Sequence, residues 1–287
     1  MIAWRSPHAA GILSGHDEFD AGDPGGMRNC IGPGESNVSE TDLHRSKSID
    51  YQGPHLIARA YRKALITVGG NATLLRFLAF LWKMIPFRAR RGVTFLFIKT
   101  VLWEKRLLKI DEQTEITAIK DLGSLAYWGF PTVDLNDFHL TVDGAVDHPL
   151  SLSWPELKAL HLVNRQVRMD CVGGFRNNTV MTGVAVPQLL DMAGVSDQAQ
   201  RVVFHCLDGY YVSLEIKDLR DREAFLASTT NGEELPKFGF PLRLAVPRKY
   251  GYQWAKWVHR LEVVTDNRKG YWANLGLSDR GDVGDVW

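Results

Sequence analysis

The residues best suited to chemistry lie in one short stretch, residues 169–176, which reads Met-Asp-Cys-Val-Gly-Gly-Phe-Arg. Cys171 lies between a run typical of a strand and a run typical of a helix, and a pair of glycines follows it. Because glycine has no Cβ, Gly173 lets the backbone turn tightly and approach a ligand closely. A thiolate is a soft ligand and suits a transition metal better than magnesium or calcium. The other interpretation of Cys171 is a buried structural cysteine beside a turn.

Several motifs accompany this cysteine in a fixed order. The most informative are Gly-Phe-Pro-Leu-Arg-Leu-Ala-Val-Pro at residues 239–247 and Tyr-Gly-Tyr-Gln-Trp-Ala-Lys-Trp at residues 250–257. With the Cys171 loop they resemble the molybdopterin-binding oxidoreductases of the sulfite oxidase superfamily. In that family a single cysteine binds molybdenum, and the later segment packs around the pterin. The resemblance runs from about Asp134 to Trp287 and also includes residues 140–146 (Leu-Thr-Val-Asp-Gly-Ala-Val), Gly183-Val184, Asn231-Gly232, Leu235-Pro236 and Gly270-Tyr271-Trp272.

The resemblance implies a molybdenum-pyranopterin cofactor and assigns residues to it. Cys171 would be the single protein ligand of the metal, and the pterin would supply further sulfur. A pterin phosphate and an oxo-molybdenum group both need fixed cations and backbone N–H donors. Arg176 matches an arginine that lines the anion pocket of sulfite-oxidising relatives, so Cys171 and Arg176 are the implied catalytic residues. The implied cofactor-binding residues are Cys171, Gly173, Arg243, Lys249 and Lys256.

Three positions depart from the family pattern. A tryptophan, a histidine and a tyrosine of the family's motifs are replaced here by Met181, Phe238 and Leu277. These differences argue against sulfite as the substrate, because Met181 and Leu277 cannot donate a hydrogen bond to an oxyanion. They are also what a catalytically silent member of the fold would show.

The function expected from the resemblance is transfer of an oxygen atom to or from a small oxyanion or an S- or N-oxide. No Cys-x-x-Cys-His haem motif is present, so we expect electrons to pass to or from a separate carrier. The alternative is a catalytically silent scaffold or membrane-peripheral protein on the same fold. Molybdenum content distinguishes the two, because the scaffold would contain none.

The elements that must position these residues are mainly strands. Apolar Phe138, Leu140 and Val142 alternate with polar residues before the turn residue Gly144, which is the pattern of a half-buried strand. Asp208-Gly209 is a strong hairpin signal between two further runs. Strands are predicted around residues 138–142, 242–246 and 258–264, and two more lie within residues 201–216, one with Val202 and Phe204 and the other with Val212, Leu214 and Ile216.

Short helices are predicted between these strands. Ser153 and Glu156 have the spacing of a capping box, and Pro187 with Gly194 brackets a second helix. The sequence therefore predicts an α+β domain with a mixed sheet over residues 111–287. The fold class that the resemblance implies, the sulfite-oxidase-like molybdopterin-binding fold, is the same.

Residues 54–110 form a basic segment of apolar runs, broken at residues 69–71 and at Pro86, which predicts two or three helices. From residue 55 the segment holds twelve Lys and Arg residues against one acid, Glu104. One interpretation is a helical appendage packed on the domain; the other is a helix lying on an anionic membrane surface. No DNA- or RNA-binding motif accompanies the charge, so nucleic acid is not an expected partner.

Residues 1–53 are rich in Gly, Ser, Pro and acids without a sustained period, which predicts disorder. The N-terminus shows neither the apolar core of a secretory signal nor a twin-arginine leader, and basic residues interrupt every apolar run before a spanning length. These features predict a cytoplasmic protein, with peripheral membrane attachment through the basic segment as the alternative.

Overall fold

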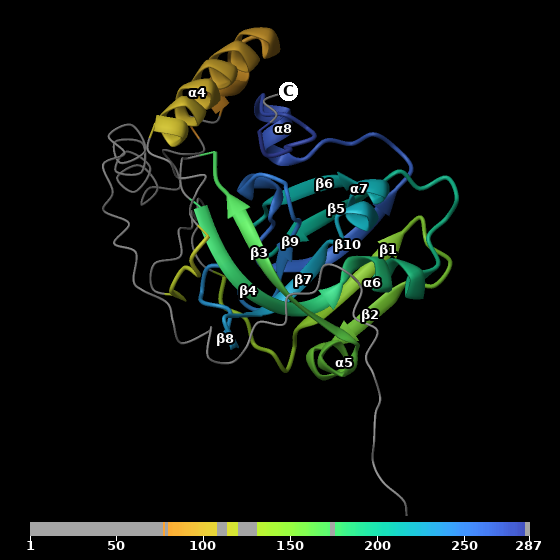
Figure 1. Cartoon of the computed structure of the whole chain (residues 1–287). Helices are drawn as coiled ribbons and strands as arrows, with labels where there is room; N and C mark the ends of the chain where they lie inside the picture. Colours follow the sequence, from red (N-terminus) through yellow and green to blue (C-terminus); the bar gives the residue numbers. More distant parts are fainter. Residues whose placement is uncertain (1–76, 78–79, 108–113, 120–130, 173–175, 285–287) are drawn as a thin grey trace, which may run out of the picture. The chain divides into compact units, whose positions relative to one another are not determined.

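The computed structural model describes residues 77, 80–107, 114–119, 131–172 and 176–284, which are drawn as ribbons in Figure 1. The predicted disorder of residues 1–53, the first part of the basic segment and the predicted ligand Gly173 lie outside these residues. Those predictions, and the domain boundaries at residues 54 and 111, stay predictions.

Two β-sheets form the framework of the domain (Figure 1). The first is mixed, because β1 and β10 run parallel while its other neighbouring strands are antiparallel. Its order is β2 (Leu150–Ser153), β1 (His139–Gly144), β10 (Val258–Val264), β5 (Arg201–Cys206) and β6 (Tyr211–Glu215). This confirms the predicted α+β fold with a mixed sheet.

The second sheet is antiparallel throughout and carries the Cys171 loop. Its path is β3 (Leu162–Asp170), β4 (Arg176–Ala185), β7 (Phe225–Thr230) and β8 (Glu233–Glu234), and β9 (Arg243–Ala245) also pairs with β7. The helix-like run expected after Cys171 is therefore wrong, because the chain continues there as β4. Strand β4 lies between β3 and β7 and is buried along nearly its whole length, so its sequence lacks the alternation that identifies a half-exposed strand.

The predicted helices form where their end signals lie. Helix α5 (Trp154–Ala159) begins after the capping box, in which Glu156 Oε2 accepts the Ser153 backbone N–H at 2.8 Å. Helix α6 (Val186–Ala193) has a proline in its first turn and ends at Gly194, whose φ of 65° suits glycine. Helix α7 (Ile216–Asp221), the 3-10 turn η3 (Gly251–Gln253) and α8 (Tyr271–Leu275) complete the domain.

Two apolar clusters hold these layers together. The larger one gathers buried residues of the mixed sheet, of α6 and of β9, with Leu140, Leu189 and Phe204 fully buried. The smaller one lies on the second sheet and consists of Val167, Met169, Met181, Phe225, Ala227, Ala245 and Trp254. Cys171 packs partly against this smaller cluster, so the loop that carries the thiol rests on a rigid support.

The described part of the basic segment is helical, as predicted. Residues 80–84 are helical, and α4 (Phe87–Leu107) begins directly after Pro86, whose carbonyl accepts the backbone N–H groups of Ala89 and Arg90. The side chain of Trp82 donates to the Leu275 carbonyl at 2.9 Å, which connects this segment to α8.

Within the described residues, no helix combines the length and the apolar character needed to cross a bilayer.

Candidate functional site

Cys171 lies directly after β3, at the connection to β4. These strands pair in register along their whole length, from Leu162 opposite Val184 to Asp170 opposite Arg176. The thiol is partly buried and forms no disulfide. The strand ladder holds this cysteine in place, and its partial exposure leaves the thiol accessible to a ligand.

A buried ion pair closes the base of this loop. Arg176 Nε donates to Asp170 Oδ1 at 2.9 Å, and a second guanidinium nitrogen lies 2.8 Å from the same oxygen. The Arg176 side chain is 3% exposed and that of Asp170 is 1% exposed. The structure thus pairs Arg176 with the residue that precedes Cys171, and Asp170 balances its charge. The predicted catalytic role of Arg176 stays a prediction.

The motif at residues 250–257 packs against the start of the loop. Tyr250 forms a parallel bridge with Asp170, and a Cβ on Gly251 would lie 2.5 Å from Met169 Sδ. A side chain at this position would require Met169 to shift. The Trp254 indole donates to the Lys249 carbonyl at 3.0 Å and belongs to the cluster that supports Cys171. The two motifs therefore meet in space.

Arg243 and Lys256 lie opposite each other on neighbouring backbone segments. They form an antiparallel bridge, and Leu244 and Val258 extend the pairing by hydrogen bonds to Ala255 and Leu242. Directly opposed residues of an antiparallel pair project on the same side, about 5 Å apart at Cβ. The two cations are consequently neighbours.

The electrostatics join these two cations to the thiol. Burial lowers the pKa of Arg243 to about 10, and burial together with Arg243 lowers the pKa of Lys256 to about 7. Cys171 acts in the opposite direction on both pKa values, and Asp208 and Cys206 also raise that of Lys256. Arg243 is 8% exposed, and its buried Nε has no hydrogen-bond partner among the described residues. Cys171, Arg243 and Lys256 therefore act electrostatically on one another, and we call these three residues the thiol–cation site.

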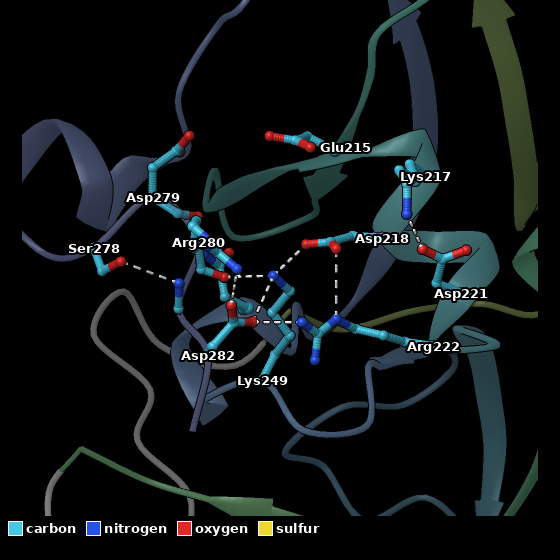
Figure 2. Close-up of polar contacts among 12 residues, drawn as sticks. Glu215, Lys217, Asp218, Asp221, Arg222, Lys249, Ser278, Asp279, Arg280 and Asp282 are labelled. Carbon is cyan, nitrogen blue, oxygen red and sulfur yellow. Dashed lines mark hydrogen bonds and ion pairs between the residues drawn. The ribbon is translucent and has the colours of Figure 1, made fainter. Parts of the chain in front are cut away.

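Lys249 takes a different position. Its side chain is fully buried, and its ammonium contacts Asp218, the Arg280 carbonyl at 2.6 Å and Asp282 at 3.0 Å (Figure 2). Arg222 joins the network through Asp282 at 2.7 Å. These acceptors match the three N–H donors of a lysine. Lys249 thus fastens the C-terminal segment to α7, and its predicted contact with a cofactor stays a prediction.

The three departures from the family pattern have different locations. Met181 is 4% exposed and lies in the cluster beneath Cys171, where no donor is presented. Phe238 is partly buried with Lys237 Nζ 5.7 Å from its ring centroid, and the backbone N–H of Leu277 donates to the Trp272 carbonyl. The residue that sequence reasoning missed is Asp170, although an acid directly before the cysteine was visible in the sequence.

Comparison with known proteins agrees with this geometry. Residues 127–272, about half of the chain, match the family described as oxidoreductase molybdopterin binding domain. The chain is 34% identical over 151 residues to the uncharacterized oxidoreductase YuiH of Bacillus subtilis, covering 52% of this chain and 76% of YuiH. It is 32% identical to the putative protein-methionine-sulfoxide reductase subunit YedZ1 of Azospira oryzae, covering 53% of this chain and 60% of YedZ1.

Two further matches extend the comparison. The chain is 28% identical to the protein-methionine-sulfoxide reductase catalytic subunit MsrP of Xanthomonas campestris, covering 54% of this chain and 53% of MsrP. The chain thus spans less than two thirds of MsrP and of YedZ1. The crystal structure of the sulfane dehydrogenase SoxCD from Paracoccus pantotrophus shares the fold, with a TM-score of 0.50 and 24% identity over 53% of this chain and 44% of that one. This chain therefore belongs to the oxidoreductase molybdopterin-binding domain family, whose cofactor is molybdopterin.

Proposed function

We propose that Cys171 ligates the molybdenum of a bound molybdenum-pyranopterin cofactor, and that Arg243 and Lys256 hold the cofactor's anionic part. The observation that carries this proposal is the thiol–cation site, with its orphaned, buried Arg243 Nε. A buried donor without an acceptor is unfavourable, and an anionic ligand supplies the acceptor. The donor set therefore fits a phosphate-bearing cofactor that carries a soft metal.

The residues around Cys171 hold its loop in position. When bound, the cofactor supplies two-electron oxygen-atom chemistry. The Asp170–Arg176 pair holds the two ends of the Cys171 loop together, and Tyr250 and Gly251 brace it from behind. Such a support limits the movement of the thiol, because both neighbouring strands would have to separate for the loop to open.

The substrate that suits this site best is a small S-oxide, which two electrons and two protons reduce to a thioether and water. YedZ1 and MsrP both carry the name of a protein-methionine-sulfoxide reductase. In this chain Asp170 balances the charge of Arg176, and Met181 offers no hydrogen-bond donor. These two residues therefore give a sulfite dianion little stabilisation. An uncharged S-oxide needs neither feature; an N-oxide would satisfy the same conditions. A separate carrier delivers the electrons in this proposal, and the cytoplasmic location stays a prediction.

Steady-state kinetics on molybdenum-replete protein test the substrate class. We expect the catalytic efficiency for methionine sulfoxide, with a reduced dye as electron donor, to exceed that for sulfite oxidation by at least about tenfold. Each missing donor toward an oxyanion typically costs about 10²–10³ in rate. Sulfite turning over tenfold better than every S- and N-oxide would sink the substrate proposal. Protein from a cofactor-competent host that contains no molybdenum would support the silent scaffold instead.

The lowered pKa of Lys256 predicts a pH-dependent anion site in cofactor-free protein. The pKa of Lys256 is about 7 in the folded protein and 10.5 ordinarily. Between these two pH values, Lys256 is therefore mostly neutral in the folded chain and mostly charged in the unfolded chain. The unfolded chain then binds more protons, so the stability of the anion-free protein rises with pH across this window. An anion favours the charged form, so its affinity falls above pH 7, by at most about tenfold per pH unit.

Sulfate is a suitable probe, because it does not itself titrate in this range. We expect sulfate to raise the melting temperature of cofactor-free protein clearly at pH 6 and much less at pH 9. Lys256→Met should remove the pH dependence, whereas Lys269→Met, at an exposed position, should keep it. Equal stabilisation by sulfate at both pH values in the unmodified chain would show that Lys256 does not contribute to an anion site.

A further inference from the structure

Exposed apolar side chains are concentrated in one part of the molecule. Among the described residues, the large hydrophobic side chains that are exposed belong to residues 77–107, with only Met192 and Leu207 outside that range. Leu96 is 68% exposed and Trp103 is 63% exposed. Exposed apolar side chains gathered in one segment are typical of an interaction surface.

Helix α4 has two different sides. Ile98 is buried, and Arg90, Thr94, Phe97 and Leu102 are partly buried. On this side Arg90 donates to the Asn274 carbonyl at 3.3 Å. The opposite side carries exposed Ala89, Val93, Leu96, Trp103 and Leu107, separated by three, four or seven residues. That spacing places them in one stripe, which we call the outer apolar stripe.

A row of cations runs beside the outer apolar stripe. Arg88, Lys99 and Arg106 are exposed, and their separations of eleven and seven residues bring them to nearly the same angle around the helix. Residues 77–107 hold seven Lys and Arg residues and a single acid, Glu104. An apolar stripe beside long cationic side chains is the pattern of a helix that lies in the headgroup region of an anionic bilayer.

We propose that α4 docks this domain onto an anionic lipid surface, with the outer apolar stripe in the headgroup–acyl boundary and the cationic row among the lipid phosphates. The charge of this surface favours an anionic bilayer over a second copy of the chain as its binding partner. A second copy of the chain would bring two cationic rows together on packing stripe against stripe, and like charges oppose that arrangement. An anionic bilayer is apolar where the stripe lies and negative where the cations lie.

Co-sedimentation of the full chain with vesicles tests the proposal. We expect binding to vesicles of phosphatidylcholine with phosphatidylglycerol, much weaker binding to phosphatidylcholine alone, and release at high salt. Each basic residue near an anionic surface contributes roughly fivefold to partitioning, so Lys99→Ala/Arg106→Ala should weaken binding about 25-fold. The matched control Lys158→Ala/Lys269→Ala removes two exposed cations elsewhere and should change binding little.

A second pair of variants tests the apolar contribution. Leu96→Gln/Trp103→Gln should weaken vesicle binding at least tenfold, while Met192→Gln/Leu207→Gln should leave it unchanged, although both pairs lie at exposed positions. Equal weakening by the α4 and the control charge variants would reduce the effect to net charge and overturn the proposal. Absence of binding to anionic vesicles, or a lipid-free dimer that Leu96→Gln/Trp103→Gln dissociates, would overturn it as well.

Discussion

Replacing Cys171 with alanine should abolish turnover while the domain stays folded. The thiol is the soft donor of the thiol–cation site and lies only partly buried, so its loss removes a metal ligand and little packing. Removing a residue that merely supports a metal ligand typically costs 10–100-fold, so losing the ligand itself should cost at least about 10³-fold. Turnover is measured with methionine sulfoxide, and X-ray absorption at the molybdenum edge should show one sulfur ligand fewer.

Cys206 provides the matched control. It is buried in the larger apolar cluster, and burial raises the pKa of its thiol well above the usual value, so it remains protonated and unsuited to bind a metal. Cys206→Ala should lower the free energy of unfolding by about 1 kcal/mol through a small cavity, and it should leave the molybdenum–sulfur signal intact. Full activity in Cys171→Ala, or loss of the sulfur signal in Cys206→Ala alone, would contradict the assignment.

The sequence predicts the parts of the fold that depend on local signals. The capping box at Ser153, the helix end at Gly194 and the Asp208-Gly209 hairpin each depend on a few neighbouring residues, and all three are confirmed. Strand β4 was missed because a central strand buried on both faces has no period of two. The division into two sheets was missed for a related reason, since strand partners are fixed by distant residues rather than by local pattern.

At the site, the sequence likewise identifies the basic residues but not the acids that pair with them in the fold. Motif resemblance pointed to Arg243 and Lys256, and the structure places these two residues opposite each other. It pointed also to Arg176 and, more weakly, to Lys249, whose charges are balanced by Asp170 and by Asp218 with Asp282. Whether a basic residue is available to a ligand depends on which acids the fold brings to it, and sequence spacing alone does not contain that information.

Arg243→Met should have opposite effects on cofactor content and on the stability of the empty protein. Arg243 is almost fully buried, its Nε lacks an acceptor among the described residues, and Lys256 lies beside it. Apolar groups of similar size in place of buried charges often stabilise a protein by about 1–4 kcal/mol. The free energy of unfolding of the cofactor-free variant should therefore be about 1–3 kcal/mol higher than that of the unmodified protein. Its pterin content should fall about 10–100-fold, because hydrogen bonds to a charged group typically contribute 1.5–3 kcal/mol.

Arg260→Met is the matched control, and it should slightly destabilise the protein without changing its pterin content. Arg260 is partly exposed and pairs with Asp143 at 2.9 Å on the mixed sheet. Losing this pair should cost less than about 1 kcal/mol, and pterin content should stay unchanged. Pterin fluorescence after oxidation and urea unfolding of cofactor-free protein give the two readouts. A buried cation that serves to bind the cofactor should destabilise the cofactor-free protein. An Arg243→Met protein that keeps its pterin and unfolds more easily would therefore show that Arg243 is a structural residue.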